Sequence, residues 1–165
     1  MRMLYKVLER SRFNTAELSR TVSEVGVYPE AAYIEMPHDV LGYLTIESIG
    51  IKEYPIKDGA DLETIKSAIG HFAETPVWDG NVSFCAHNRD YTYDFRNLKH
   101  IEEGDEVIYE TRFGTRRYTV SVIKSIDETD WTDIVSSSEV NKVTMMTCIE
   151  EEPTKRLLVQ AVQQP

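Results

Sequence analysis

The chain has 165 residues, of which 41% are hydrophobic, and 28 acidic against 18 basic side chains give it a net charge of -10. This length and hydrophobic content suit one domain with a real core, with or without an N-terminal appendage. The acidic balance argues against nucleic-acid binding, because a negative surface repels phosphate. No apolar run approaches the roughly 20 residues that cross a bilayer and no signal peptide is present, so we expect a soluble chain whose anchor, where the native protein has one, precedes Met1.

Two domains are expected: an N-terminal helical appendage over residues 1–40 and a main domain over residues 41–165. Within the appendage, residues 14–26 have the pattern of a helix. Asn14 can cap the first turn, apolar residues recur at helical spacing, and Gly26 stops the helix.

After the appendage the hydrophobic pattern changes to a period of two, which is typical of strands with one face in a core. Extended segments are expected as two short strands within residues 42–56, and then over residues 81–87, 105–112, 116–124, 143–148 and 156–162. One helix is expected over residues 61–70, with Asp61 as its cap and Gly70 as its stop. Seven or eight strands with one short helix predict an all-β fold, either a closed barrel or a sandwich.

A thiol and a guanidinium are expected to face each other near the end of the chain. Cys148 ends one predicted strand and Arg156 opens the next, with residues 149–154 as the hairpin loop. Partners across a strand pair have Cβ atoms about 5 Å apart. An activated thiolate is a nucleophile and a guanidinium can stabilise an oxyanion, so the pair could be catalytic. The alternative is a packed cysteine beside a solvated arginine that pairs with the acidic residues 150–152.

Four histidines could supply a general acid or base. His87 is the leading candidate, because it ends a predicted strand just before the polar segment "NRDYTYD" and can reach both the barrel wall and solvent. The other three are His38, His71 and His100, with His71 the next candidate. Cys85, His87 and Cys148 could instead hold a metal, but zinc sites usually have four ligands, and Cys85 is better explained as a small packed side chain.

Three motifs resemble those of the sortases, the cysteine transpeptidases of Gram-positive surfaces. The segment "TMMTC" has Thr144, Thr147 and Cys148 at the positions of the family's T-L-x-T-C motif. The segment "RLLVQA" has Arg156 at the arginine of its R-x-x-V-x-A pattern, and "GNVSFCAH" has His87 at its histidine. Each motif alone is a weak signal, but the three together, in order and at the family's spacing, are a specific one.

The resemblance runs from about Gly42 to the end of the chain, with departures that bear on its class. Ala86 stands where the family has glycine, and Met145 where it usually has leucine; both changes are small in volume. The interval of 61 residues from His87 to Cys148 leaves no room for the helical insertion of class B sortases, and the aromatic lid motif of class C is absent from the sequence. The chain therefore resembles class D, or a class A or E relative.

The resemblance implies a closed eight-stranded sortase-type β-barrel with an N-terminal helical appendage. It implies that Cys148 attacks the carbonyl of a Thr–Gly bond in an LPxTG-like sorting signal, that His87 protonates the leaving amine, and that Arg156 positions the peptide and its oxyanion. The residues implied to contact the substrate are Ala86, Thr144 and Thr147.

The implied partners are the sorting-signal peptide of a surface protein and an amine acceptor, either a peptidoglycan cross-bridge or a pilin lysine. The implied location is the extracellular face of the Gram-positive cell membrane, through an anchor that this chain lacks. No cofactor is implied, although calcium is an alternative, with Glu74, Asp79 and residues 127–133 as candidate ligands. Two other functions stay open: a cysteine peptidase that releases the peptide to water, and a non-catalytic barrel that binds peptides around a buried Cys148.

Overall fold

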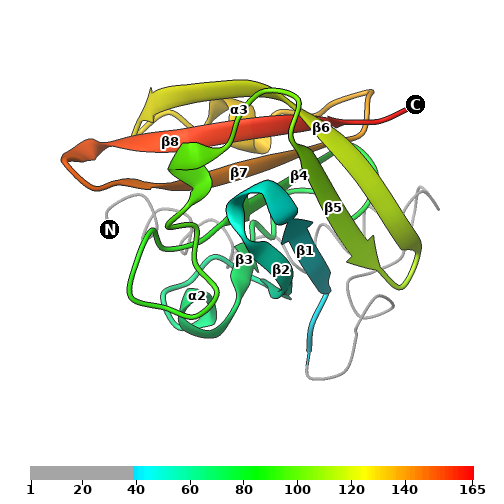
Figure 1. Ribbon diagram of the computed structural model, residues 1–165, viewed down its shortest axis with the longest axis horizontal. Coiled ribbons are helices and arrows are strands. Elements are labelled where there is room, and N and C mark those ends of the chain that lie inside the picture. Colours follow the sequence, from blue (N-terminus) through cyan, green and yellow to red (C-terminus); the bar gives the residue numbers. More distant parts are fainter. Residues whose placement is uncertain (1–38) are drawn as a thin grey trace.

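The computed structural model describes residues 39–165, so the predicted helix at residues 14–26 and nearly all of the 1–40 appendage lie outside the described residues. The strands of the described part close into a barrel in the order β1-β2-β3-β4-β7-β8-β6-β5 (Figure 1). They are β1 (Gly42–Ile46), β2 (Ile51–Asp58), β3 (Ile69–His71), β4 (Asn81–Cys85), β5 (Glu106–Thr111), β6 (Gly114–Asp127), β7 (Lys142–Ile149) and β8 (Glu152–Gln163). The closed barrel confirms the predicted all-β fold and rules out the sandwich.

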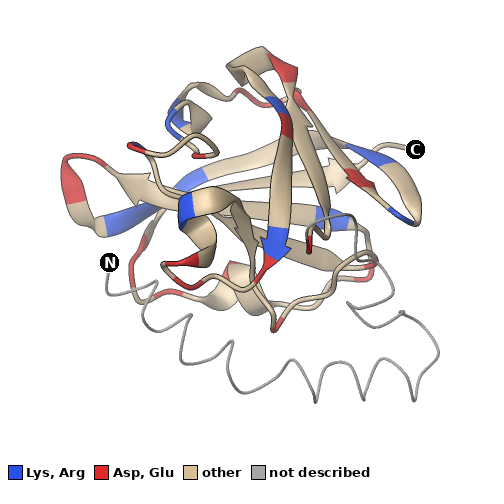
Figure 2. Cartoon of the chain, turned by 90° about the horizontal axis from the view of Figure 1, so that it is seen from below, with Lys and Arg blue, Asp and Glu red and all other residues tan. Residues whose placement is uncertain are grey.

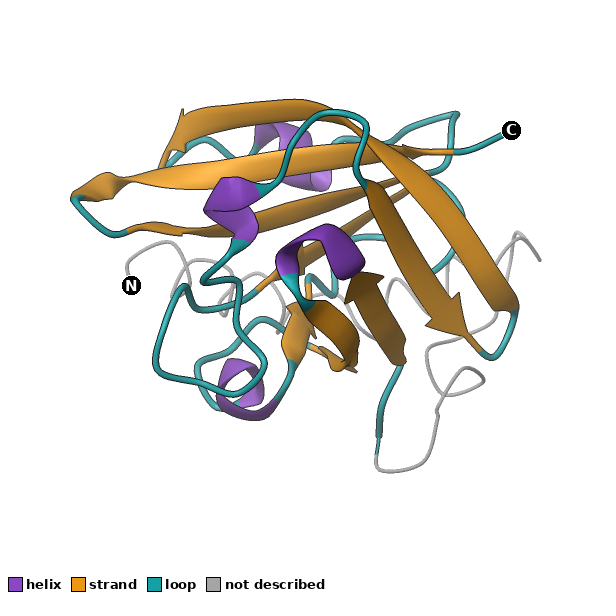
Figure 3. Ribbon diagram, viewed as in Figure 1, coloured by secondary structure: helices purple, strands orange, loops and turns teal. Residues whose placement is uncertain are grey.

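Short helices connect some of these strands, and Figure 3 shows them as small turns beside a scaffold of strands. Those of the described part are η2 (Glu47–Ile49), α2 (Thr64–Ser67), η3 (Leu98–His100) and α3 (Thr132–Val135). The sequence predicted only the one at α2. No helix within residues 39–165 has the length and the apolar character that crossing a membrane requires.

The helix predicted over residues 61–70 is shorter than expected, because only its middle is helical. Asp61 does cap it: its carboxylate accepts hydrogen bonds from the backbone N–H and from Oγ1 of Thr64, both at 2.8 Å. Gly70, however, lies inside β3, where a Cβ would be 2.7 Å from the carbonyl oxygen of Gly59. The prediction of Gly70 as a helix stop was therefore wrong, because this glycine serves a close approach of two backbones.

The parallel pairing of β4 with β7 positions the two leading catalytic candidates. Cys85 lies opposite Met146 in this ladder, and a hydrogen bond of 3.3 Å from Ala86 N to Met146 O extends the ladder past the end of β4. Because the two strands run in the same direction, their carboxyl ends meet at one edge of the barrel. His87, two residues past the end of β4, and Cys148, near the end of β7, line the same cleft at this edge.

Two apolar clusters lie on the two faces of the barrel wall. The main core includes Phe84 of β4 and Met145 of β7, which point into the barrel. A second, smaller cluster consists of Ala60, Ile65, Phe72, Cys85, Ile126, Ile134, Met146 and Leu158. Side chains alternate between faces along a strand, so Cys148, two residues after Met146, belongs to the face of the second cluster. The candidate site therefore lies on the outer face of the barrel.

Buried polar side chains of β4 and β7 fix the segment between β6 and β7 against this outer face. Asn81 donates through Nδ2 to the carbonyl oxygen of Asp133 at 2.9 Å, and Thr144 donates to Asn81 Oδ1 at 2.6 Å. Ser83 donates through Oγ to the carbonyl oxygen of Ile134 at 2.7 Å. Each bond satisfies a buried polar group, so the segment that carries α3 is packed in one position beside the site.

Candidate active site

The hairpin of β7 and β8 brings the candidate thiol and guanidinium together. Cys148 and Arg156 are direct partners in its antiparallel ladder, which confirms the pairing predicted from the sequence. The loop predicted over residues 149–154 is wrong in length, because only residues 150–151 separate the two strands and a register shift follows Cys148. Figure 2 shows this acidic turn in red at the left end of the barrel.

Arg156 is buried rather than solvated, with 1% of its surface exposed. Its Nη1 donates hydrogen bonds to the carbonyl oxygens of Pro153 at 2.9 Å and Lys155 at 2.7 Å. Its Nη2 donates to Glu128 Oε2 at 3.4 Å. The alternative of a surface arginine that pairs with residues 150–152 is therefore wrong.

These hydrogen bonds use three of the five N–H donors of Arg156. Its Nε is buried and has no hydrogen-bond partner among the described residues. An unsatisfied buried donor costs roughly 1–3 kcal/mol, so native structures contain few of them, and each calls for an explanation.

His87 follows β4 and is half-buried at the same edge of the barrel. Its ring stacks on that of Tyr91, with the ring centroids 4.5 Å apart and the planes 24° from parallel. Burial lowers the pKa of His87, against the opposing effect of the Asp94 and Asp90 carboxylates, which raise it. The neutral imidazole is therefore favoured in the free protein, and it can accept a proton and return it.

A single cleft of about 550 Å³ is lined by His87, Cys148 and Arg156 together, with Tyr91 and Glu128 in its wall. A second cleft of about 190 Å³ also reaches Cys148, and its wall includes Phe95, Lys99, Thr147 and Leu157. The thiol thus lies where two clefts meet. A nucleophile, a proton carrier and an oxyanion donor around one accessible cleft are the groups that acyl transfer requires.

The sequence profile of the sortase domain matches residues 44–164. The chain belongs to the sortase family. A relative, sortase D of Bacillus subtilis (strain 168), is 28% identical over 109 residues, which cover 65% of this chain and 53% of the relative, so the chain spans about half the length of that protein.

Solved sortase structures have the same fold. Sortase C1 of Streptococcus agalactiae, solved in complex with MTSET, is 25% identical with a TM-score of 0.75, covering 99% of this chain and 91% of that one. Sortase C-1 of Actinomyces oris is 25% identical with a TM-score of 0.72, covering 81% and 78%. Sortase A of Listeria monocytogenes is 21% identical with a TM-score of 0.67, covering 77% and 88%. These likenesses agree with the eight-stranded barrel implied by the sequence resemblance.

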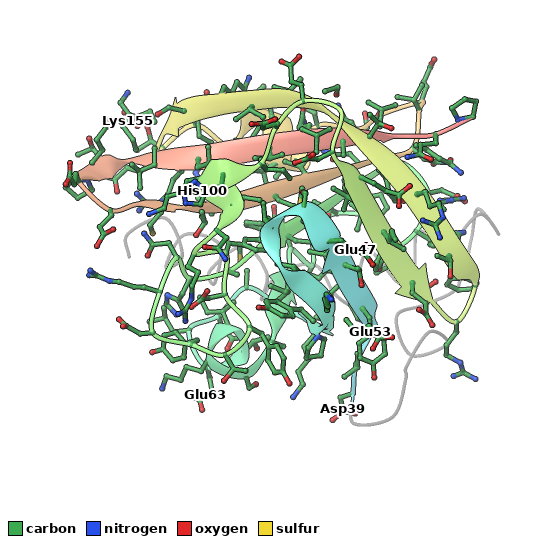
Figure 4. The ribbon with its side chains drawn as sticks, viewed as in Figure 1. Asp39, Glu47, Glu53, Glu63, His100 and Lys155 are labelled. Carbon is green, nitrogen blue, oxygen red and sulfur yellow. The ribbon has the colours of Figure 1, made fainter. Side chains whose placement is uncertain are left out.

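The other histidines of this sortase lie in different surroundings from His87. His71 is fully buried, and its Nδ1 and Nε2 lie 2.8 Å from Asp58 Oδ1 and from the carbonyl oxygen of Pro76. Both ring nitrogens of His71 are thus engaged in the barrel wall. His100 is exposed on η3, as Figure 4 shows, and His38 lies outside the described residues.

The second cysteine of this sortase, Cys85, is fully buried in the apolar cluster of the outer face. Burial raises the pKa of its thiol well above the ordinary range, so Cys85 stays protonated and unreactive. Within residues 39–165 no three side chains of the histidine, cysteine, aspartate or glutamate type gather as metal ligands. The interpretation of Cys85 as a packed side chain is confirmed, and the alternative of a metal held by Cys85, His87 and Cys148 is wrong.

Carboxylates considered for calcium have other partners in the described part of the chain. Asp79 forms an ion pair with Arg116 at 2.6 Å, and Asp133 forms one with Lys124 at 2.5 Å. Calcium needs about 6–8 converging oxygen ligands. These two carboxylates each face a cation instead, on different parts of the surface.

Ala86, Thr144 and Thr147, which the motifs implied as substrate contacts, lie at different places relative to the clefts. Thr147 lines the smaller cleft, and its Oγ1 donates to the carbonyl oxygen of Ala86 at 2.8 Å, which ties β7 to the residue before the catalytic candidate His87. Thr144 is fully buried and accepts a hydrogen bond from Gln160 Nε2 at 3.0 Å. Thr147 and Ala86 thus fix the spacing between β4 and β7 at the site.

Two residues at the site were not predicted from the sequence. Tyr91 contacts His87 from four residues further along the chain, inside the segment that was recognised only as polar. Glu128 reaches Arg156 because β6 pairs with β8, with Ile126 opposite Arg156. Tyr91 could have been singled out as the first aromatic residue after the candidate histidine, whereas Glu128 depends on a strand pairing that no local pattern predicts.

Proposed function

We propose that this sortase is a cysteine transpeptidase that cleaves an LPxTG-like sorting signal between threonine and glycine and transfers the threonine carbonyl to an amine. The observation that carries the proposal is that His87, Cys148 and the buried Arg156 line one cleft, with Arg156 directly opposite Cys148 in the strand ladder. A surface arginine would not have this burial, and a fully packed cysteine would not line a cleft.

The first half-reaction forms a thioester. His87 takes the proton of the Cys148 thiol. The resulting thiolate attacks the threonine carbonyl carbon, and the carbonyl electron pair moves onto oxygen, where Arg156 donates a hydrogen bond. The tetrahedral intermediate then collapses: the C–N bond breaks while protonated His87 gives its proton to the leaving glycine nitrogen.

The second half-reaction regenerates the enzyme. The acceptor amine attacks the thioester carbonyl, and His87 takes a proton from its nitrogen. Collapse of this second intermediate breaks the C–S bond, forms the new amide and returns the thiolate of Cys148. His87 thus acts as an acid toward the leaving amine and as a base toward the incoming one, and its imidazole is protonated and deprotonated in each cycle.

The proposed substrate and acceptor follow from membership of the sortase family rather than from a bound ligand. The substrate is the sorting signal of a surface protein, and the acceptor is the amine of a peptidoglycan cross-bridge or of a pilin lysine. The proposed place of action is the extracellular face of a Gram-positive cell membrane. Among sortase classes, the match to a sortase D supports class D.

Peptide cleavage with and without amines tests the proposal. An LPxTG-containing peptide is incubated with the enzyme alone, with triglycine and with a lysine peptide, and products are identified by mass spectrometry. We expect a product that joins the threonine to the added amine. Hydrolysis that no amine diverts would support a cysteine peptidase, and a bound but uncleaved peptide would support a non-catalytic barrel.

Replacing Arg156 by lysine should lower the cleavage rate by about 10²–10³, the cost of one lost oxyanion donor. Lysine can place one ammonium group there, but it cannot bond the carbonyl oxygens of Pro153 and Lys155 while also presenting a donor to the substrate. Arg156→Ala should lose no less. The measurement is kcat/KM for peptide cleavage, with melting temperature as the folding control.

Arg117→Lys is the matched control, because Arg117 is an exposed arginine whose ion pair with Glu106 is worth only about 0–1 kcal/mol. Its activity should stay near that of the wild type. If folded Arg156→Lys kept more than half of the wild-type rate, the guanidinium would have no catalytic role.

A further inference from the structure

Among residues 39–165, His87 has no partner of the kind that usually orients a catalytic histidine by a hydrogen bond. In cysteine and serine enzymes a carboxylate or amide commonly bonds one ring nitrogen and fixes the tautomer and the direction of the imidazole. Among residues 39–165 no group makes a hydrogen bond with a ring nitrogen of His87, and Asp94 Oδ1 and Oδ2 are bonded elsewhere. The described contact of the imidazole ring is the stack on Tyr91.

The stacked ring of Tyr91 is itself fixed through its backbone. Its N–H donates to Asp94 Oδ2 at 3.2 Å, and its carbonyl oxygen accepts a hydrogen bond from Arg96 Nη2 at 3.0 Å. Arg96 in turn donates from Nε to Asp94 Oδ1 at 2.9 Å and from Nη2 to Asp94 Oδ2 at 2.8 Å. The ion pair of Asp94 and Arg96 therefore holds both polar groups of the Tyr91 backbone.

The carboxylate of this ion pair is buried, since the Asp94 residue is only 3% exposed, whereas the Arg96 side chain is 56% exposed. Burial by itself would raise the pKa of Asp94, but the hydrogen bonds from Arg96 and from the Tyr91 N–H lower it further than burial raises it. Asp94 therefore stays ionised at neutral pH, and the backbone of Tyr91 stays held.

The loop that carries Tyr91 also closes on His87. The N–H of Phe95 donates to the carbonyl oxygen of His87 at 2.7 Å, so the two ends of the loop are joined. Phe95 is buried in the main core, which anchors that end. The ring stack and this backbone hydrogen bond therefore both keep Tyr91 close to His87.

From this geometry, and on the basis of the proposed function, we propose that Tyr91 is a positioning residue: its ring takes the place of the usual carboxylate and holds the His87 imidazole toward the cleft that Cys148 lines. The pair of Asp94 and Arg96 holds Tyr91 in turn. The aromatic face, rather than the phenol hydroxyl, carries this role, because the contact is a stack.

Tyr91→Ala, Tyr91→Phe and Tyr93→Ala, made in the full chain, test the proposal. Tyr93 is the matched control: it is a tyrosine of the same loop, but its ring packs edge-on against Tyr54 at 5.2 Å instead of against His87. Two quantities are measured, kcat/KM for cleavage of the LPxTG peptide and the NMR titration of the His87 Cε1–H. Among the described residues, the charged groups that act on His87 are Asp94, Asp90 and Lys66, and all three variants leave them unchanged.

We expect Tyr91→Ala to lower kcat/KM by about 10–100-fold, since a small misplacement of a catalytic group has effects of this size. The pKa of His87 should rise toward its ordinary 6.5 in this variant, because removing the ring exposes the imidazole to water. Tyr91→Phe keeps the stack and should restore both the rate and the titration. Tyr93→Ala should resemble the wild type in the His87 titration.

Three results would overturn the proposal. The first is a Tyr91→Ala variant with unchanged rate and unchanged His87 titration. The second is a Tyr93→Ala variant with the same changes as Tyr91→Ala, which would indicate general loosening of the loop. Loss of rate in Tyr91→Phe equal to that in Tyr91→Ala would move the role to the hydroxyl and also overturn it. Failure of the proposed transpeptidase function can be distinguished from failure of the Tyr91 proposal. The NMR titration of His87 detects the loss of the Tyr91 ring even in a protein that cleaves no peptide.

Discussion

Cys148→Ala should abolish peptide cleavage, with a loss on the order of 10⁴-fold or more, because no other group can form the thioester. Cys85→Ala should keep most of the activity, since Cys85 is buried in the outer apolar cluster and its raised pKa keeps the thiol protonated. The cost of this second change is one of packing, about 1 kcal/mol for a small core truncation. The measurement is kcat/KM for both variants beside the wild type.

Thiol labelling provides the control for this pair of variants. A peptide-mimicking electrophile should modify the wild type and Cys85→Ala once each, at Cys148, and should leave Cys148→Ala unmodified. Circular dichroism and melting temperatures check that all three proteins are folded. An equal loss of activity in two folded variants would contradict the assignment of a single nucleophile.

His87→Ala should lower kcat/KM by about 10²–10⁴-fold, the contribution typical of a positioned general acid or base. The loss has two sources, because the same imidazole protonates the leaving amine and accepts the proton of the incoming one. His100→Ala is the matched control, since His100 is exposed on η3, and its activity should stay close to that of the wild type. Steady-state kinetics with the LPxTG peptide measure both effects.

Near-normal turnover by folded His87→Ala would assign the proton transfer to another group. His71 is a poor substitute, because both of its ring nitrogens already lie 2.8 Å from oxygen atoms inside the barrel wall. A His71→Gln variant distinguishes a structural role of His71 from a role in proton transfer. We expect a lower melting temperature in thermal unfolding, and an unchanged cleavage rate at temperatures where the variant is still folded.

Much of the fold could be predicted from periodicity, but not how the strands close. The alternation of buried and exposed residues indicated most strands, and it is the same in a sandwich and in a barrel. The three-residue strand β3 was missed because Gly70 after an apolar helical pattern is the usual signal of a helix end. Strand β6 extends to Asp127 through a register shift between Val120 and Val122, which interrupts the period on which the prediction rested.

The candidate site was predictable where a motif carried it. Cys148, His87 and Arg156 came from the resemblance to sortases and from the expected hairpin, and the structure places them around one cleft. The burial of Arg156 was not predictable, because a lone arginine in an acidic segment is usually solvated. Its burial depends on Glu128, which is brought near by the pairing of β6 with β8.

The short turn between β7 and β8 has a practical consequence for engineering this protein. Exposed acidic turns are ordinarily good places to insert a tag or a surface-display sequence. Here the carbonyl oxygens of Pro153 and Lys155, just past the turn, bond the guanidinium that faces Cys148. An insertion would therefore displace, from outside the cleft, the guanidinium for which we propose a catalytic role. The turn between β5 and β6, at the opposite end of the barrel in Figure 1, is the better point of attachment.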